Sequence, residues 1–403
     1  MSVFSGKKIL LGVTAGIAAY KTASLVRLFI KLGADVQVIM TPASKDFITP
    51  LTLSTLSKKP VYDSFYNKNE ENELWNNHVE LGLWADLFLI APATANTLSK
   101  MSNGTCDNLV LATYLSAKCP VFVAPAMDLD MYRHTSTKTS LQKLTSFGNM
   151  VIPVGSGELA SGLVGEGRMA EPEDIVSHIT HHLLSTLPLY GKKVLLTAGP
   201  TYEAIDPVRF IGNYSSGKMG FSIAIEAANL GAEVTLIAGP SNEKVSHSFI
   251  HRIDVNSAKE MYDTSHQFFN QCDIAILSAA VADYKPKNCS LQKIKKADQT
   301  LLIELEPTQD ILASLGALKK QQFLVGFALE TNNEEANAIS KLKRKNLDMI
   351  VLNSLKDQGA GFATSTNKVT IYQQDTTKNT YPLKSKVEVA KDILNEIIHK
   401  LNV

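Results

Sequence analysis

The stretch GKKILLGVTAG, residues 6–16, recurs in the middle of the chain as GKKVLLTAGPT, residues 191–201. Two more pairs follow in the same order: LGADVQVIMTP (32–42) with LGAEVTLIAGP (230–240), and WADLFLIAPATAN (84–96) with QCDIAILSAAVAD (271–283). Each echo holds a short apolar run beside a turn, and helical stretches separate the runs. The repeat predicts an α/β fold with two doubly wound parallel-sheet domains, each covered by helices on both faces.

A short linker separates the two predicted domains. The segment LSTLPLYGK, residues 184–192, contains Pro188 and Gly191 and follows a helix-like stretch. We therefore expect a first domain over residues 1–189 and a second over residues 190–403. A length of 403 residues is enough for two full hydrophobic cores.

The second half carries an insertion close to its first strand. Gly6 and Gly33 of the first half are 27 positions apart, whereas the matching Gly191 and Gly231 are 40 apart. The 13 additional residues lie within PTYEAIDPVRFIGNYSSGKMG, residues 200–220. Doubly wound sheets bind their ligands beyond the carboxyl ends of the strands. This polar, glycine-rich loop is therefore predicted to belong to a site.

Composition restricts the classes of partner. Hydrophobic residues make up 45% of the chain and charged residues 20%, as in soluble globular proteins. The 40 basic and 39 acidic side chains leave a net charge of +1, which favours neither nucleic acid nor an anionic membrane. The four cysteines show no CxxC spacing, which argues against disulfides and a zinc site. We therefore expect a cytoplasmic protein.

The amino-terminal segment has the outline of a secretory signal, because Lys7 and Lys8 precede an apolar run from Ile9 to Tyr20. The recurrence of the pattern in mid-chain, and the glycines within the run, instead predict a strand followed by a turn. No run approaches the roughly 18 residues that a membrane span requires.

The turn after the first strand suits a phosphate. Thr14 and Gly16 lie where a strand meets a helix N-terminus, although a tight turn without a ligand has the same pattern. The spacing is not GxGxxG, and the second strand ends in Met40 and Thr41 where a dinucleotide site requires an acidic residue. A mononucleotide is therefore favoured over NAD, and a nicotinamide dehydrogenase is a distant alternative.

Four ordered motifs carry a family resemblance across roughly residues 6–180. They are HVEL with His78, PATANT (92–97), PAMDLDMY (125–132) and the stretch 157–169, which ends in GEGRM. Together they resemble the flavin-dependent cysteine decarboxylases. The resemblance implies a flavodoxin-like fold, FMN above the strand ends and a catalytic role for His78. By motif match FMN contacts Thr14, Gly16, Thr41, Thr94, Asn96 and Met127, and the substrate contacts Asp128, Met131, Arg168 and Met169.

The chemistry that the resemblance implies is a decarboxylation next to an aminothiol. Such a carboxylate loses CO2 slowly unless the electrons left behind can be delocalised. Flavin makes this possible by oxidising the thiol carbon and later returning the electrons. Two positions depart from the family. Ser161 replaces a cysteine that gives the last proton, and an alcohol is a far weaker acid than a thiol. Asp128 replaces an asparagine that contacts the substrate carboxylate. An aspartate there would repel that carboxylate unless it is protonated or paired with a cation such as Arg133.

The second half resembles bacterial phosphopantothenate:cysteine ligases over residues 190–400. Alone, its lysine runs at 293–296 and 341–345 are typical of solvated faces, but the resemblance implies CTP and Mg2+ there, with the metal ligands unknown. Arg209, Asn213, Ser216 and Gly217 of the inserted loop match the residues that hold the acyl-cytidylate, with Asn213 and Lys293 catalytic. The CTP residues by motif match are Ser278, Ala279, Asp283, Lys293, Asp310, Ile311, Phe327, Lys341 and Lys345.

The order of the halves resembles the bifunctional enzymes of coenzyme A biosynthesis. In that family the ligase joins 4'-phosphopantothenate to cysteine and the decarboxylase converts the product to 4'-phosphopantetheine. The departures at Ser161 and Asp128 keep an alternative open, an active ligase whose flavin domain has lost decarboxylation and serves regulation or assembly. The resemblance also implies a homo-oligomer, with decarboxylase trimers and ligase dimers combined in a dodecamer.

Overall fold

The computed structural model divides the chain into two compact units, Met1–Leu184 and Ser185–Val403. It describes residues 2–66, 75–296, 300–330, 332–354, 364–375 and 377–401. The division falls at the start of the predicted linker, near the end of α8 (Pro172–Ser185). All four cysteines are free. Within the described ranges, no helix has the length and apolarity to cross a bilayer.

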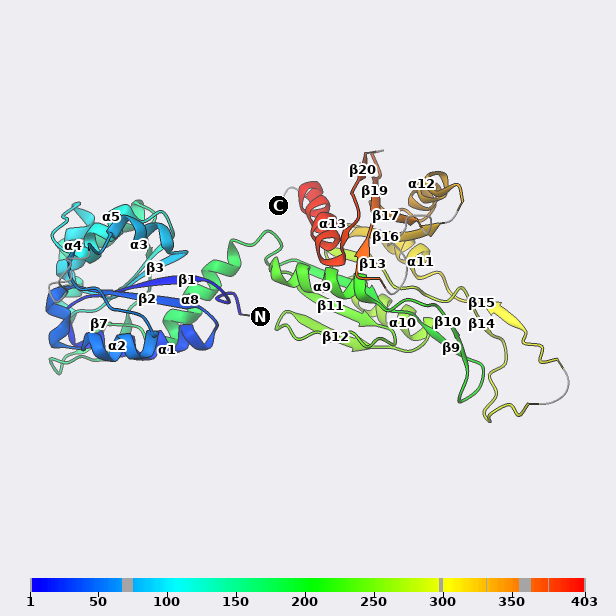
Figure 1. Ribbon diagram of the computed structural model, residues 1–403, viewed down its shortest axis with the longest axis horizontal. Helices are drawn as coiled ribbons and strands as arrows, with labels where there is room; N and C mark the ends of the chain where they lie inside the picture. The colour runs from blue at the N-terminus through cyan, green and yellow to red at the C-terminus, as the bar shows by residue number, and fades with distance from the viewer. Residues whose placement is uncertain are drawn as a thin grey trace. The chain divides into compact units, whose positions relative to one another are not determined.

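The first unit is built on a five-stranded parallel sheet in the order β2-β1-β3-β4-β5, the flavodoxin-like arrangement (Figure 1). Its strands, with the separate hairpin β6–β7, are β1 (Lys8–Val13), β2 (Asp35–Met40), β3 (Leu87–Ala93), β4 (Val121–Pro125), β5 (Met150–Val151), β6 (Gly155–Glu158) and β7 (Val164–Arg168). Its other helices are η1 (Ile17–Lys21), α1 (Thr22–Lys31), η2 (Pro42–Asp46), α2 (Pro50–Ser57), α3 (His78–Trp84), α4 (Ala95–Ser102), α5 (Leu109–Ser116), α6 (Leu129–Arg133) and α7 (Thr135–Ser146).

The apolar run of β1 explains why helices cover both faces of this sheet. Ile9 and Leu11 belong to one buried cluster with residues of α1 and α8, and Leu10 belongs to a second cluster with residues of α4 and α5. Successive strand residues point to opposite faces, so an uninterrupted apolar run requires cover on each side. Each such fully buried side chain contributes about 1.5–3 kcal/mol.

The second unit holds an eight-stranded sheet in the order β12-β11-β8-β13-β16-β17-β19-β20. The first six strands are parallel in the Rossmann order, and the last two are antiparallel to their neighbours. The sheet strands are β8 (Lys193–Ala198), β11 (Glu233–Ala238), β12 (Ile250–Asp254), β13 (Ile274–Leu277), β16 (Phe323–Glu330), β17 (Met349–Ser354), β19 (Val369–Gln373) and β20 (Lys378–Thr380). The helices are α9 (Lys218–Asn229), α10 (Ala258–Phe269), α11 (Ile311–Leu318), α12 (Glu334–Arg344) and α13 (Lys386–Leu401).

Three short antiparallel pairs lie outside the large sheet of this unit. They are β9 (Tyr202–Ala204) with β10 (Phe210–Gly212), β14 (Tyr284–Pro286) with β15 (Leu305–Pro307), and β18 (Thr366–Asn367) with β21 (Lys384–Ser385). The β9–β10 hairpin lies within the segment 200–220 that holds the insertion of the sequence. Figure 1 shows this hairpin and β14–β15 extending away from the sheet.

The internal repeat corresponds to three neighbouring strands of each sheet. Strands β1, β2 and β3 match β8, β11 and β13, and the first member of each set lies in the middle of the other two. The prediction of two doubly wound parallel sheets is thus confirmed. The segment that has the outline of a secretory signal forms β1 and η1.

Candidate active sites

A cavity of about 970 Å³ lies at the carboxyl ends of β1, β2, β3 and β4 in the first unit. This edge includes the point where the strand order reverses, between β1 and β3, which is where doubly wound sheets bind their ligands. The volume is at the upper end of the range usual for cofactor sites. Nine of the residues predicted for flavin or substrate line it: Gly16, Thr41, Thr94, Asn96, Met127, Asp128, Met131, Arg168 and Met169.

Thr14 does not face the cavity as the sequence suggested. Its side chain is buried, and Oγ1 donates to the Pro92 carbonyl at 2.6 Å and accepts from the Thr94 amide at 3.4 Å. The hydroxyl therefore joins the end of β1 to the end of β3 rather than remaining available to a phosphate. Gly16, two positions later, does line the cavity.

Thr41 offers the clearest sign that the cavity is built for a polar ligand. Its Oγ1 is buried and has no hydrogen-bond partner among the described residues. Burying a hydroxyl without a partner costs roughly 1–3 kcal/mol, so such a group persists where a ligand completes it. A phosphorylated, planar cofactor fits this lining of small, hydroxyl and amide groups.

The β6–β7 hairpin forms one wall of the cavity through Glu158, Leu159 and Ala160. Its docking depends on two glycines. A Cβ on Gly165 would lie 2.7 Å from Leu129, and a Cβ on Gly167 would lie 2.5 Å from the Met127 carbonyl. Gly167 also has φ +128°, and its carbonyl accepts from the Met127 amide at 3.0 Å. The GEG sequence is therefore a packing requirement.

The two departures from the family pattern occupy different places. Ser161 lies at the exposed tip of the hairpin, outside the cavity lining, and its Oγ accepts from the Leu163 amide at 3.4 Å. Asp128 lines the cavity, and its Oδ1 caps α6 by accepting from the Leu129 amide at 2.6 Å. Among the described residues no ion pair joins Asp128 to Arg133, so the helix cap replaces the partner that the sequence suggested.

Lys21 is a cavity residue that sequence reasoning missed. It is 5% exposed, and its Nζ donates to the Met169 carbonyl and to Glu171 Oε1, both at 2.9 Å. Glu171 Oε1 also accepts from Arg168 Nη2 at 2.8 Å. The Lys21 hydrogen bond, above all, holds the pKa of Glu171 below its usual range. A lysine a few residues after the predicted phosphate turn was the signal in the sequence.

His78 is the first residue of α3 and does not line this cavity. Its ring meets Phe65 and Trp75 edge-on, with centroids 6.1 Å apart in each pair. Its Nδ1 is buried without a partner among the described residues. The histidine is thus held by aromatic packing, with one ring nitrogen unused by the fold.

Hydrogen bonds join the segments that follow β8 and β13 at the carboxyl-terminal edge of the second sheet. The Ala280 amide donates to the Gly199 carbonyl at 2.9 Å, and Thr201 Oγ1 accepts from the Ala282 amide at 2.9 Å. Ser278 Oγ donates to the Thr197 carbonyl at 2.7 Å. Gly199 is in the left-handed region at φ +83°, where its backbone approaches Gly239 closely. This edge is the switch point of the second sheet.

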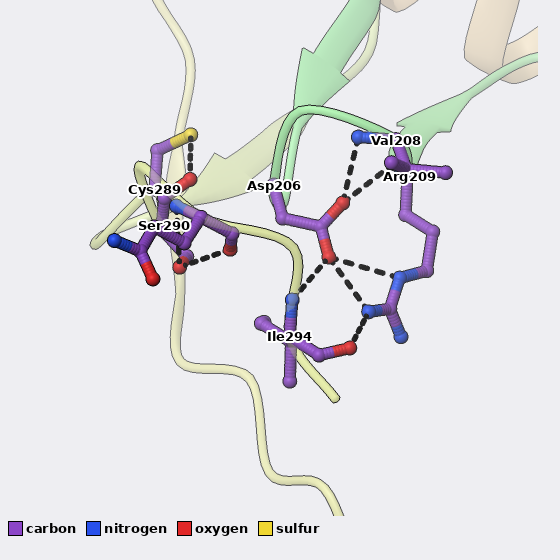
Figure 2. Close-up of polar contacts among 7 residues, drawn as sticks. Asp206, Val208, Arg209, Cys289, Ser290 and Ile294 are labelled. Carbon is purple, nitrogen blue, oxygen red and sulfur yellow. Dashed lines mark hydrogen bonds and ion pairs between the residues drawn. The ribbon is translucent and has the colours of Figure 1, made fainter. Parts of the chain in front are cut away.

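Asp206 organises the inserted loop (Figure 2). Its carboxylate is fully buried and accepts from the amides of Val208, Arg209 and Ile294 at 2.8, 2.8 and 3.1 Å. Arg209 adds an ion pair at 2.7 Å to Asp206 and donates to the Ile294 carbonyl. Burial opposes ionisation of Asp206, but the three backbone donors and Arg209 outweigh it and lower the pKa to about 2.

The predicted substrate groups of this loop are used by the fold. Arg209 bridges two loops, and Asn213 Nδ2 donates to the carbonyls of Ala280 and Val281 at 3.0 and 3.3 Å. Ser216 Oγ accepts from the Lys218 amide at 3.4 Å. Gly217, with φ +82°, caps the start of α9, and a Cβ at this position would lie 3.1 Å from the Gly199 backbone. Arg209 and Asn213 therefore hold the loop at the switch point instead of projecting free donors.

Five of the residues predicted for CTP form one connected group. Lys345 pairs with Asp310 at 2.7 Å, and Asp310 caps α11, which begins at Ile311. Lys341 Nζ donates to the Phe327 carbonyl at 2.7 Å. Burial, and then Lys345, lower the pKa of Lys341.

The remaining CTP residues are less closely connected. Ser278 and Ala279 lie at the switch point. Asp283 follows on the exposed segment before β14, and its charge opposes the lowering of the pKa of Lys341. Lys293 is exposed, and within the described ranges no hydrogen bond or ion pair joins it to the other predicted residues. In the same ranges no three His, Cys, Asp or Glu side chains form a metal-binding group.

Fold and site together define a two-domain α/β enzyme whose flavodoxin-like unit precedes a Rossmann-like unit. The family model described as Flavoprotein matches residues 3–184, and the model described as DNA/pantothenate metabolism flavoprotein C-terminal domain matches residues 189–401. The chain belongs to the family of the bifunctional coenzyme A biosynthesis protein CoaBC.

Three relatives illustrate the similarity. The coenzyme A biosynthesis bifunctional protein CoaBC of Vibrio cholerae is 45% identical over 99% of this chain and 100% of its own length. A cysteine/cysteine sulfinic acid decarboxylase from an unknown prokaryotic organism is 56% identical over 87% of this chain and 99% of its own length. The crystal structure of the C-terminal domain of a CoaBC protein is 43% identical, covers 54% of this chain and 99% of that domain, and has a TM-score of 0.47.

Proposed function

We propose that the chain carries out two successive steps of coenzyme A biosynthesis. The second unit ligates 4'-phosphopantothenate to cysteine with CTP, and the first unit decarboxylates the product to 4'-phosphopantetheine. The observation that carries this proposal is the polar cavity of the first unit, where nine of the residues predicted for flavin or substrate converge, in the same chain as a ligase-family unit.

FMN is the proposed cofactor of the cavity. The unpartnered Thr41 hydroxyl and the backbone after β1 and β3 would hold it, because they supply polar groups at the switch point of the sheet. When bound, a flavin supplies the electron acceptor that a β-thiol carboxylate needs in order to lose CO2. Asp128 and Arg168 face the same cavity and would orient the substrate.

The β6–β7 hairpin would exclude water from the cavity of the first unit. Glu158, Leu159 and Ala160 cover the cavity, and Lys21 fixes the end of the hairpin through the Met169 carbonyl and Glu171. Ser161 at the tip is proposed to position a water or the product rather than to donate its own proton.

In the second unit, activation of the carboxylate by CTP would form an acyl-cytidylate and release pyrophosphate. Cysteine nitrogen then displaces CMP, so atoms and charge balance over the two steps. Lys341 and Lys345 are proposed to meet the nucleotide, with Mg2+ neutralising the phosphates. The contacts of Arg209 and Asn213 with the protein support a positioning role for both residues in the inserted loop.

A homo-oligomer is also proposed, because His78 is assigned a catalytic role yet lies outside the cavity lining of its own unit. A neighbouring copy would supply it. Exposed apolar side chains on the second unit, Tyr214, Leu291 and Leu302, support a second contact there. Decarboxylase trimers joined through ligase dimers would give a dodecamer, and sedimentation equilibrium measures its mass.

The mass of the product tests the proposed function. Purified protein is incubated with phosphopantothenate, cysteine, CTP and Mg2+, and products are followed by mass spectrometry together with CO2 release. Phosphopantetheine is the expected product. Accumulation of phosphopantothenoylcysteine with no CO2 would instead support a ligase whose flavin unit has lost catalysis, and no ligated product would reject the proposal.

A second candidate substrate comes from the 56% identical relative, whose name states decarboxylation of cysteine and cysteine sulfinic acid. Each free amino acid is therefore offered alone, without CTP or phosphopantothenate. CO2 release from either at a rate equal to that from phosphopantothenoylcysteine would assign the first unit to the free amino acid.

A further inference from the structure

Asp128 lies where the wall of the first cavity meets the β6–β7 hairpin. A Cβ on Gly167 would lie 3.5 Å from the Asp128 carbonyl carbon, and the Met127 amide donates to the Gly167 carbonyl at 3.0 Å. Arg168, the next residue of β7, lines the cavity together with Asp128. A carboxylate and a guanidinium therefore enter the cavity from adjoining backbones.

The fold uses only one oxygen of the Asp128 carboxylate. The side chain is partly buried, and Oδ1 accepts from the Leu129 amide at 2.6 Å. No hydrogen bond or ion pair joins Oδ2 to another of the residues that the structure describes. A carboxyl group can carry a proton on one oxygen while the other accepts a hydrogen bond. Asp128 is thus held in place by Oδ1 with Oδ2 available to a ligand.

The other ionisable groups of the cavity wall are less suited to give a proton. The carboxylates that line the cavity are Asp107, Asp128 and Glu158. Asp107 pairs with Lys100, and this hydrogen bond above all lowers the pKa of Asp107, so it stays ionised. Glu158 is exposed on the hairpin, and Lys21 is bonded to the end of the hairpin. Asp128 is the partly buried acid that the fold leaves available.

The proposed decarboxylation requires an acid after CO2 has left. The carbon that needs the proton is the one that carried the carboxylate, so a group in contact with that carboxylate lies within reach of the carbon once CO2 departs. Ser161 is exposed and lies outside the cavity lining. An asparagine at position 128 contacts a carboxylate equally well but has no acidic proton. The aspartate is therefore chemically different at the place where an acid is required.

We propose that Asp128 is the catalytic acid that gives the last proton of the decarboxylation, a role that Ser161 cannot fill. The inference rests on the proposed function of the first unit. Arg168 attracts the substrate carboxylate to the wall beside Asp128, and two carboxylates in contact share one proton. Because the substrate carboxylate must be ionised to leave as CO2, the shared proton stays on Asp128.

The step balances in atoms and charge. Asp128 transfers its proton to the carbon that lost CO2, and the carbon next to sulfur receives a hydride from the reduced flavin. Two C–H bonds form while the carbon–carbon double bond becomes a single bond. The product therefore gains one proton and one hydride, and the flavin is oxidised again. Asp128 is left as a carboxylate, which takes up a proton from solvent when the next substrate binds.

The charges around Asp128 leave Arg168 as its neighbour in the cavity. The charged or titratable residues on α6, at the start of α7 and on β7 are Asp130, Tyr132, Arg133, His134, Glu166 and Arg168. Burial raises the pKa of Tyr132, which therefore stays protonated, and the other five side chains are exposed. Of these six, Arg168 alone lines the cavity. The protonation of Asp128 is thus set mainly by the bound carboxylate and by Arg168.

The first test measures proton uptake and needs no catalysis. The probe is 4'-phosphopantothenoylserine, which keeps the substrate carboxylate but lacks the thiol. It is titrated calorimetrically into the full-length protein in two buffers of different ionisation enthalpy. The wild type should take up about one proton per ligand bound, and Asp128→Asn close to none. Asp130→Asn, an exposed aspartate of α6 outside the lining, is the control and should match the wild type. No uptake by the wild type, or equal uptake by Asp128→Asn, overturns the proposal.

The second test follows a single turnover of phosphopantothenoylcysteine. Asp128→Asn should release CO2 within about ten-fold of the wild-type rate, because asparagine still contacts the carboxylate. Saturated phosphopantetheine should form at least about 100-fold more slowly, with a product two hydrogens lighter and reduced flavin accumulating. Saturated product at the wild-type rate in Asp128→Asn overturns the role of Asp128. So does accumulation of the lighter product by the wild type, or by Glu158→Gln in place of Asp128→Asn.

A second substitution separates an acid from a merely structural residue. Ser161→Cys places a thiol on the hairpin, so the double variant Asp128→Asn with Ser161→Cys should again form saturated product. A change on the hairpin would not correct a fold damaged at position 128. Loss of both CO2 and saturated product in Asp128→Asn, uncorrected by Ser161→Cys, overturns the acid role. Absence of CO2 release by the wild type refutes the proposed function, whereas absence of proton uptake in a protein that releases CO2 refutes Asp128 alone.

Discussion

The ligand edges of the two units differ in how their polar groups are used. In the first unit Thr41 Oγ1, which lines the cavity, and His78 Nδ1, which lies outside its lining, are buried without hydrogen-bond partners among the described residues. In the second, Asp206, Arg209 and Asn213 are all bonded to the protein. The first site is therefore preformed for a tightly held cofactor, whereas the loop of the second is held in place by the residues first expected to bind substrate.

The largest expected effect tests the unpaired histidine of the first unit. His78→Asn should lower CO2 release from phosphopantothenoylcysteine by a factor of about 100 or more, because a positioned histidine contributes roughly 10²–10⁴ in proton transfer. Ligation and bound flavin should be unchanged. CO2 evolution from the preformed intermediate is the measurement.

His134→Asn is the matched control for that experiment. His134 is exposed and caps α7, where asparagine is also a preferred cap, so the fold should be unaffected. Decarboxylation at the wild-type rate in His78→Asn would remove the histidine from the site and leave the unpaired nitrogen unexplained.

The next effect tests the bonded loop of the second unit. Asp206→Asn keeps the shape but replaces an acceptor of four hydrogen bonds and an ion pair by a group whose amide nitrogen faces donors. Ligation should fall about 10- to 100-fold, with decarboxylation of supplied phosphopantothenoylcysteine unchanged. Loss of both activities together would show that the two sites are not independent.

The same carboxylate gives the loop a defined pH dependence. The pKa of Asp206 is lowered to about 2 from its usual 3.8, so its contribution to stability is complete above about pH 4 and is lost as the pH falls toward 2. Chemical denaturation of wild type and Asp206→Asn should show a stability difference that shrinks over this window. A difference independent of pH between 5 and 2 would contradict the assignment.

The fold was predictable because three echoed apolar runs form three neighbouring strands in each sheet. An uninterrupted apolar run must be covered by helices on both faces of its sheet. The parallel sheet and its helical layers therefore follow from the pattern of apolar runs along the chain. The β9–β10 hairpin was located only as extra length. Its docking depends on the buried Asp206, and nothing in a local pattern distinguishes an aspartate that accepts four hydrogen bonds from the protein from one that contacts ligand.

The cavity lining was predictable for a related reason. Residues that follow parallel strands meet at one edge, so Thr41, Asn96 and Met127 converge without any knowledge of side-chain contacts. Thr14 and Lys21 could not be assigned in this way. Whether a hydroxyl after a strand faces a ligand or the Pro92 carbonyl is decided by contacts almost 80 residues distant in sequence.

A smaller effect is expected from the buried lysine of the first unit. Lys21→Met removes the donor to the Met169 carbonyl and to Glu171, so the hairpin end and Arg168 lose their anchor. The KM for phosphopantothenoylcysteine should rise about ten-fold with a smaller change in kcat. Lys31→Met, an exposed lysine of α1, is the control. A fall in kcat alone would assign Lys21 to the chemistry instead.

The smallest effect concerns Ser161, whose position at the hairpin tip contrasts with the buried groups below it. Its hydroxyl accepts from the Leu163 amide at 3.4 Å and lies outside the cavity lining. An alcohol is also too weak an acid to donate a proton readily. Ser161 is therefore expected to act by orientation, so its removal should slow product formation less than ten-fold while leaving CO2 loss intact.

Two substitutions sharpen this prediction in opposite directions. Ser161→Ala should release CO2 at the wild-type rate and form saturated phosphopantetheine more slowly, whereas Ser161→Cys should remain active or improve because a thiol near pKa 8.5 is a better proton donor. Mass spectrometry separates the saturated product from one two hydrogens lighter. If the wild type itself releases only the lighter species, the serine has truncated the reaction. If Ser161→Ala matches the wild type in both products and rates, the final proton comes from elsewhere and the exposed tip has no part in the chemistry.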